Sequence, residues 1–369
     1  ENAFGDCPNL SSITWDAWTG LFHSLSSDAF SGVCQTGGAV TVTNPSDGHD
    51  SDALLNHLLR KGGLPQSWAK DVVNPLPDEV YKFSEDGETL LGFQDAFLND
   101  SASPIYKDNF QNCDTMQIPA SVTSIADNAF FNNESSIFPS FIKNLTFAEG
   151  SHCSSIGNTA FQRFPALTSA TFPSSLESIG SGAFFQCRDL TVVDLSNCGN
   201  LTTFNSAGAT FSGCTSLTSV VLPSSFTTIP YLSFEDCSTL TSVNFPSSLA
   251  EIGKSAFSGY SSLDSINLSE CIDLTVINFN AFYNCSALTS VSFPSRLKTL
   301  GVSVFTDCNN LRNIIWNAWT GDTTIGQSAF NRVYSEGKVQ VTNPKDDAHN
   351  SAALLAYLKE KGLPDGWHI

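Results

Sequence analysis

Hydrophobic and polar residues alternate in a phrase that recurs along the chain. One copy reads Leu240-Thr-Ser-Val-Asn-Phe-Pro-Ser-Ser-Leu249-Ala-Glu-Ile-Gly-Lys-Ser-Ala-Phe257. Val243 and Phe245 show the period of two that a half-buried strand requires. Pro246 lacks an N–H group and ends the strand, after which Ile252 and Phe257 return to the interior. Each copy therefore predicts one strand, a turn and a return segment that closes a coil.

The phenylalanine that closes each copy gives the period of the repeat. The steps between successive copies are 23, 27, 23, 23, 25, 23 and 25 residues, measured at Phe161, Phe184, Phe211, Phe234, Phe257, Phe282, Phe305 and Phe330. A period in this range is typical of stacked units that pack on their neighbours. We therefore expect a repeat solenoid, which offers a long surface and no single deep cleft.

The run LTSVxFPSSLxxIGxxAFxxCxxL resembles the BspA-like, Treponema-type class of leucine-rich repeat over about residues 115–330. The resemblance implies a mainly β, right-handed curved stack of coils of about 23 residues. It also implies a parallel sheet on the concave face and few helices apart from those of a C-terminal cap. Members of this class are cell-surface or secreted proteins of host-associated microbes, and often adhesins.

A second, longer period relates the two ends of the chain, because Cys7–Gly20 is similar to Cys308–Gly321 and Ser51–Gly62 is similar to Ser351–Gly362. We interpret both segments as caps. The predicted division is residues 1–70 as the end of an upstream array with its C-terminal cap, 71–115 as a linker that leads into the next array, 116–330 as the leucine-rich repeat array, and 331–369 as the C-terminal cap with a helix at 351–361. Within the linker, residues 81–90 resemble a hairpin that turns at Asp86-Gly87.

The predicted cap helix has signals at both ends. Asn350 or Ser351 can serve as its N-cap, Leu354 and Leu358 share one face, and Gly362 stops it. A solenoid needs such a lid over its last coil.

The tryptophans beside the caps are interpreted as packing residues. Trp15 and Trp316 replace an inward-facing phenylalanine, so we expect them in the core. Trp18 and Trp319 are expected to pack under the caps, with stacking on sugar rings as the alternative.

The charge of the chain narrows the classes of partner. Asp and Glu number 36 against 17 Lys and Arg, for a net charge of -19. Such a surface repels phosphate backbones and anionic lipids, so we expect no nucleic-acid partner. No run approaches 18 apolar residues, so we expect no membrane insertion by this fragment.

Seven of the eleven cysteines share one position, three residues after a repeat phenylalanine: Cys7, Cys113, Cys187, Cys214, Cys237, Cys285 and Cys308. Phe164 and Tyr260 take the same position in other coils. A position that accepts a thiol or a ring is typical of apolar packing, so we predict free, buried thiols. Disulfides between neighbouring coils are the alternative, since strand spacing is compatible with them.

No arrangement of residues indicates catalysis. HExxH and paired CxxC motifs are absent from the sequence. The cluster of Asp346, Asp347 and His349, echoed at residues 47–50, is interpreted as a polar loop before a helix rather than a metal site. Cys153 follows His152, but adjacent residues in an extended segment point apart. We predict a non-enzyme without cofactor or metal.

The outward positions of the strands are the candidate binding residues. They are mostly short, uncharged and rich in hydroxyl groups: Thr168, Thr171, Val192, Asp194, Ser219, Val221, Ser242, Asn244, Ser265, Asn267, Ser290, Ser292, Asn313 and Ile315. Such a face can hydrogen-bond a protein or a glycan, although the Ser and Thr pattern also suits a solvated sheet with no ligand.

The leading hypothesis is a recognition or adhesion module of a microbial cell-surface or secreted protein, which binds an extracellular host or matrix protein or a glycan. The alternative is a structural spacer or stalk that presents another domain. A glycan-active enzyme is a remote third, because no carboxylate pair lies in a recognisable motif.

Overall fold

The computed structural model describes residues 12–15, 39–42, 80–94, 114–131 and 141–369. The chain divides into two units, Glu1–Pro77 with Asp95–Met116, and Asp78–Gln94 with Gln117–Ile369. In the first unit, β1 (Ser12–Trp15) and β2 (Ala39–Val42) pair in parallel. The repeats lie in the second unit.

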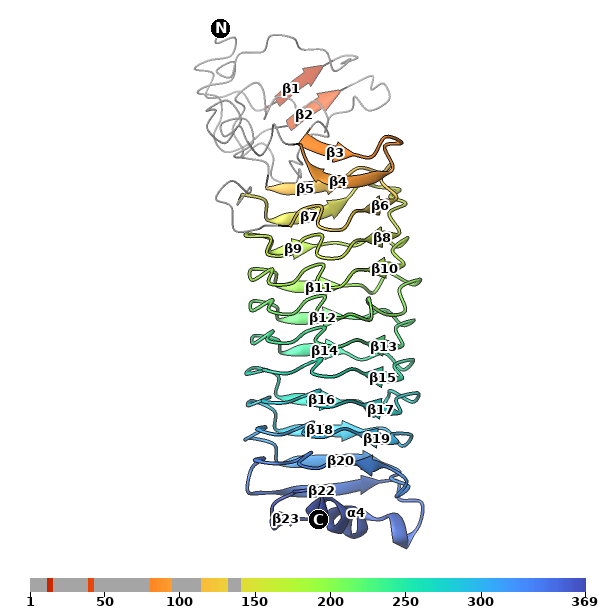
Figure 1. The fold of residues 1–369 in the computed structure, drawn as a ribbon, viewed down its shortest axis with the longest axis vertical. Coiled ribbons are helices and arrows are strands. Elements are labelled where there is room, and N and C mark those ends of the chain that lie inside the picture. Colours follow the sequence, from red (N-terminus) through yellow and green to blue (C-terminus); the bar gives the residue numbers. More distant parts are fainter. Residues whose placement is uncertain (1–11, 16–38, 43–79, 95–113, 132–140) are drawn as a thin grey trace. The chain divides into compact units, whose positions relative to one another are not determined.

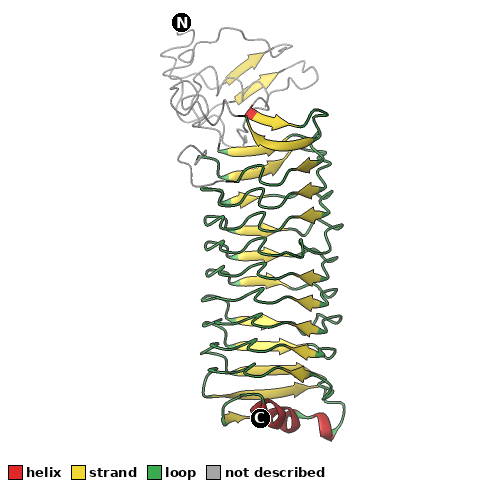
Figure 2. Cartoon of the chain, in the orientation of Figure 1, coloured by secondary structure: helices red, strands yellow, loops and turns green. Residues whose placement is uncertain are grey.

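The second unit is a β-solenoid of about nine stacked coils, as the repeat predicts (Figures 1 and 2). Strands of three to seven residues, apart from the two-residue β9, follow one another on one side of the coils: β5 (Thr115–Ile118), β7 (Asn144–Phe147), β9 (Ser169–Ala170), β11 (Val192–Asp194), β12 (Ser219–Val221), β14 (Ser242–Asn244), β16 (Ser265–Asn267), β18 (Ser290–Phe293), β20 (Asn313–Asn317) and β22 (Glu336–Thr342). We refer to this side as the long-strand side. On a second side lie β4 (Thr89–Phe93) and the two-residue strands β6 (Ser124–Ile125), β8 (Ser155–Ile156), β10 (Ser178–Ile179), β13 (Thr228–Ile229), β15 (Glu251–Ile252), β17 (Val276–Ile277), β19 (Thr299–Leu300) and β21 (Thr324–Ile325).

The predicted hairpin leads into this second side. β3 (Tyr81–Phe83) pairs with β4 in antiparallel fashion, and Gly87 in the connecting turn has a φ of 76°. β4 then pairs in parallel with β6, so the hairpin provides the first rung of the short-strand ladder.

The long strands form two sheets rather than one. The first has the order β14-β12-β11-β9-β7-β5, and the second has the order β16-β18-β20-β22 followed by the cap strand β23 (Gly366–His368). The described residues show no pairing between β14 and β16. Two features coincide with this interruption. The Oδ1 atom of Asn244 accepts the Leu222 N–H at 2.6 Å, and Tyr260 replaces the usual cysteine in the turn before β16.

A third side of each coil, around the closing phenylalanine, is also hydrogen-bonded to the next coil. Phe184 N–H donates to Thr210 O at 2.8 Å and Gln186 N–H donates to Ser212 O at 2.8 Å. Gln186 has a φ of 58°, a left-handed conformation that residues other than glycine adopt infrequently. The equivalent residue of several other coils, such as Arg163 and Asp236, is left-handed too. The N–H groups of this turn thereby find carbonyls in the following coil.

The closing phenylalanines form a continuous column through the interior. Adjacent rings from Phe130 to Phe330 are stacked with centroids 5.1–5.6 Å apart and planes within 16° of parallel. Every ring in the column is buried. Each coil thus contributes one ring to the column, and the packing of the core repeats from coil to coil.

All eight described cysteines are unpaired and buried, which confirms the prediction of free thiols for this part of the chain. At the repeated position, three residues after the column phenylalanine, the side chain also makes a hydrogen bond that apolar packing does not explain. Cys237 Sγ donates to Phe211 O at 3.3 Å, and in the next coil the Tyr260 hydroxyl donates to Phe234 O at 2.7 Å. The position therefore supplies a donor to a buried carbonyl of the previous coil.

The glycine of the repeat is explained by close approach rather than by a left-handed backbone. Gly253 does not have a positive φ, and Pro230 and Ala126 take the same position in other coils. A Cβ atom at Gly253 would lie 2.7 Å from the Pro230 carbonyl carbon. A larger residue here would push two coils apart.

The C-terminal cap has the predicted helix, α4 (Ser351–Glu360), preceded by the 3₁₀ turn η4 (Asp347–His349). Asn350 is the N-cap, and its side chain accepts the N–H groups of Ala352 and Ala353. Leu354 and Leu358 are fully buried. A further strand, β23 (Gly366–His368), pairs with β22 and was not predicted. Helix and strand together cover the last coil.

The cap tryptophans pack as expected. Trp316 is fully buried, and Trp319 stacks against Tyr357 of α4 with ring centroids 6.0 Å apart. Trp18 lies outside the described residues.

The pairing of β1 with β2 has the register of β20 with β22. Trp15 pairs with Val42 as Trp316 pairs with Val341, and Ile13 pairs with Val40 as Ile314 pairs with Val339. The two ends of the chain therefore share a backbone arrangement as well as a sequence pattern. The division of the chain into two arrays and their caps stays a prediction.

Replacing a ring in the middle of the column should destabilise the array. We expect Phe234→Ala to lower the free energy of unfolding by about 3–5 kcal/mol, because a fully buried ring is lost between two stacked neighbours. Chemical denaturation followed by circular dichroism measures this. Val192→Ala, at a side chain that is 42% exposed, is the control and should change the value by less than about 0.5 kcal/mol. Equal effects of the two substitutions would contradict a contribution of the column to the stability of the array.

The thiols should be unreactive in the folded protein. Burial raises the pKa of Cys187 and Cys237 from 9.0 to about 12, so the reactive thiolate is scarce at neutral pH. We expect iodoacetamide without reductant to leave the eight described cysteines unmodified in the native state and to modify all eight after denaturation. Peptide mass mapping reads out both states. Disulfide-linked peptides from neighbouring coils would contradict the structure.

The same thiols make the array sensitive to alkali. Above pH 9 the unfolded chain loses thiol protons that the folded chain keeps, so stability falls as pH rises. Each such thiol should remove about 1.4 kcal/mol per pH unit in this window. Denaturant titrations at a series of pH values should show a shallower decline for Cys237→Ala than for the wild type, and identical slopes would refute the assignment.

Candidate binding surface

The outward side chains of the long strands stand in rows, because the parallel pairing is in register. Val192 pairs with Ser219, which pairs with Ser242; one row further along, Asp194 pairs with Val221, which pairs with Asn244. Neighbouring strands lie about 4.8 Å apart, so side chains in one row touch. All fourteen predicted residues therefore lie on the long-strand side, but the interruption after β14 separates those before Ser265 from the rest.

Several predicted residues already have partners within the stack. Thr168 Oγ1 donates to Lys143 O at 3.1 Å, and Thr171 Oγ1 donates to Leu145 O at 3.4 Å. Asp194 and Asn267 each accept a backbone N–H two residues ahead, at 2.9 and 3.1 Å. Asn244 accepts the Leu222 N–H. The polar groups of these residues therefore form hydrogen bonds that stabilise the fold.

Threonines at the start of the long strands follow the same rule. Thr191 Oγ1 donates to Thr168 O at 2.9 Å, Thr218 Oγ1 to Thr191 O at 3.0 Å, and Thr241 Oγ1 to Thr218 O at 3.1 Å. Much of the hydroxyl-rich pattern in the sequence is thus a ladder between coils and not a binding signal.

Four of the predicted residues form a patch whose side chains make fewer hydrogen bonds within the stack. Val192, Ser219, Val221 and Ser242 come from the adjacent strands β11, β12 and β14, and we name them the valine patch. Val192 is 42% exposed, and Val221 and Ser219 are half-buried. Two apolar side chains beside two small hydroxyl groups give a flat surface that can exclude water against a partner.

The remaining predicted residues lie on the second sheet. Ser265, Ser290 and Asn313 form one row, and Asn267, Ser292 and Ile315 form the other. Ile315 is half-buried beside Gln340 of β22. This part of the face is more polar than the valine patch.

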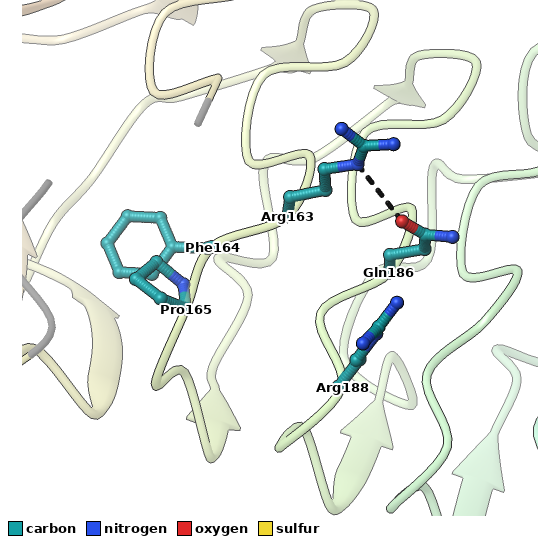
Figure 3. A pocket seen from close by; sticks show the side chains of 5 residues that line it. All are labelled: Arg163, Phe164, Pro165, Gln186 and Arg188. Atoms are coloured by element: carbon teal, nitrogen blue, oxygen red, sulfur yellow. Dashed lines mark hydrogen bonds between the residues drawn. The ribbon is translucent and has the colours of Figure 1, made fainter. Parts of the chain in front are cut away.

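A basic pocket of about 210 Å³ was missed by sequence reasoning (Figure 3). It lies between two successive coils and is lined by Arg163, Phe164, Pro165, Gln186 and Arg188. Arg163 Nε donates to Gln186 Oε1 at 3.0 Å, and this hydrogen bond joins the side chains of two successive coils. The pocket is smaller than those that enclose whole ligands, and it suits one anionic group. The available signal was two arginines at turn positions that are mostly uncharged in other coils.

The acidic loop before α4 and the His152-Cys153 pair have surroundings typical of structural residues. Asp346 Oδ1 accepts the Ala348 N–H and lies 2.6 Å from His349 Nδ1, as expected of a polar loop before a helix. That contact lowers the pKa of Asp346. Cys153 is buried, which raises its pKa to about 11, while His152 is exposed. Across the described ranges, no three His, Cys, Asp or Glu side chains gather as a metal site would require. The equivalent cluster at 47–50 lies outside those ranges.

These observations define a repeat protein whose candidate binding residues lie on its surface. A family model described as BspA type Leucine rich repeat region matches six copies over residues 92–207, 136–259 and 207–337. The chain belongs to this family. Leucine-rich repeat proteins are a non-enzymatic scaffold type, and the family implies a protein-interaction module.

Solved structures of bacterial leucine-rich repeat proteins are similar to the chain. One from Bacteroides ovatus has 24% identity and a TM-score of 0.41, and the match covers 73% of this chain and 88% of that one. A leucine rich cell surface protein from Faecalibacterium prausnitzii has 23% identity and a TM-score of 0.38, with 72% and 88% covered. The T. pallidum leucine-rich repeat protein has 17% identity and a TM-score of 0.39, with 78% and 97% covered. No curated protein matches the chain.

None of the helices in the described residues has the length and apolar character needed to cross a bilayer.

Proposed function

We propose that the chain is a non-catalytic recognition and adhesion module of a microbial cell-surface or secreted protein. It binds an extracellular host or matrix protein, or a glycan, through the long-strand side. The observation that carries the proposal is the valine patch, where the register brings Val192 and Val221 together with Ser219 and Ser242 on adjacent strands. An exposed apolar group framed by hydroxyl groups is a common form of interface core.

The family supports the surface location and the absence of catalysis in this proposal. The net charge of -19 supports a neutral or basic partner, because long-range repulsion slows the approach of acidic ones.

A charge placed in the valine patch should weaken this binding. We expect Val192→Arg with Val221→Arg to weaken binding about tenfold or more, because an arginine cannot enter an apolar contact without losing its hydration. Immobilised matrix proteins and glycans, probed with the purified chain by biolayer interferometry, provide the measurement. Asn244 is left unchanged in this design, since its amide accepts the Leu222 N–H.

Ile272→Arg is the matched control, because Ile272 is 58% exposed and lies away from the patch. Unchanged binding by the double variant would refute the valine patch as the contact. A wild-type chain that binds nothing on the panel would favour the spacer hypothesis instead.

A further inference from the structure

Four consecutive coils depart from the repeat at one outward position, three residues before the column phenylalanine. They carry an apolar or cationic side chain there: Tyr231, Lys254, Phe279 and Val302. The other described coils have small, polar or acidic residues at this position: Asp127, Asn158, Ser181, Gly208 and Gln327. We name the first set the ridge. Tyr231 is 41% exposed, Phe279 40% and Val302 43%.

The backbone under the ridge is fixed from coil to coil. Each ridge carbonyl accepts an N–H from the preceding coil: Ala209 donates to Tyr231 at 2.8 Å, Leu232 to Lys254 at 3.0 Å, Ser255 to Phe279 at 3.0 Å and Asn280 to Val302 at 3.1 Å. The following coil also presses close, since a Cβ at Gly301 would lie 2.5 Å from Phe279 N. A partner therefore meets a surface whose backbone needs no ordering on binding.

Lys254 lies between the two aromatic residues. Its Nζ atom is 5.6 Å from the ring centroid of Tyr231 and 5.3 Å from that of Phe279. In the part of the chain that the structure describes, no carboxylate forms an ion pair with this ammonium group. Glu251, on the same coil, has its Oε1 atom engaged by Asn278 Nδ2 at 2.6 Å. The rings hold the charge in place but leave it available to an incoming anion.

We propose that the ridge binds a protein segment that carries one carboxylate between apolar side chains. Exposed aromatic residues with a cation are the composition of interface hot spots, and a carboxylate complements Lys254. A glycan would stack on open ring faces, whereas here the ammonium group occupies ring faces of Tyr231 and Phe279. The net charge of -19 further restricts the segment to an otherwise neutral or basic one. This inference rests on the proposed function of non-catalytic recognition and adds a second surface with a stated partner chemistry.

A displayed library of random peptides tests the proposal. The library is selected on the full chain after depletion on the variant Tyr231→Ser/Lys254→Gln/Phe279→Ser. We expect the enriched peptides to share an Asp or Glu flanked by aromatic or aliphatic residues. The most enriched peptide is then synthesised with its acid and with the corresponding amide, and both forms are titrated by calorimetry.

The single variants separate the roles of the rings and the charge. Tyr231→Ser and Phe279→Ser should each weaken the acidic peptide about tenfold. Lys254→Gln should weaken the acidic peptide and leave the amide peptide unchanged, which shows that the two charges meet. Ile272→Ser removes an even more exposed apolar side chain elsewhere and should change neither affinity. Circular dichroism confirms that each variant is folded.

Three outcomes would overturn the proposal: enriched peptides without an acid, equal binding to the ridge variants, or enrichment no greater than on the depletion variant. Binding on a glycan array that the ridge substitutions abolish would assign the surface to sugars instead. Failure of the valine patch is distinguishable, because the ridge variants leave Val192 and Val221 in place.

Discussion

The stacked phenylalanine column is the constraint on which the rest of the structure depends. Parallel rings 5.1–5.6 Å apart require every coil to rise by nearly the spacing of paired strands. The backbone N–H and C=O groups around the column must then find hydrogen-bond partners in the neighbouring coil at this spacing. Left-handed residues, close glycine contacts and buried thiol donors recur in the coils because each meets this requirement at one corner.

Hydrogen bonding without charge is the second consequence of a repeating interior. Carbonyls at the coil corners accept hydrogen bonds from the hydroxyl or thiol groups of the following coil, as with Thr218, Cys237 and Ser248. Only 14% of the residues are charged, since the fold relies little on ion pairs. Many of the abundant surface Ser and Thr residues therefore hold neighbouring coils together. Binding residues are to be expected among the side chains that make no such hydrogen bond between coils.

The sequence predicts the elements that have a period or a local signal. The strand around Val243, the hairpin turn at Gly87 and the Asn350 cap of α4 all follow from such patterns. Strands such as β15 are too short to show a period, so their ladder was missed. The left-handed conformation of Leu232 is imposed by neighbouring coils and has no local signature. Likewise, the rows on the long-strand side were predicted, but the interruption after β14 depends on contacts between coils.

Binding surfaces on such a molecule arise where outward residues depart from the repeat. Inward positions are dictated by the column and its carbonyls, whereas the outward position of Tyr231 holds side chains as different as Ser181, Lys254 and Phe279 in other coils. Exposed apolar residues there cost solubility and add nothing to the core. Val221 and Tyr231 belong to one coil but lie on different sides of it, one on β12 and the other in the turn that follows β13. A single coil thus contributes to two separate surfaces, so a substitution on one side leaves the side chains of the other side in place.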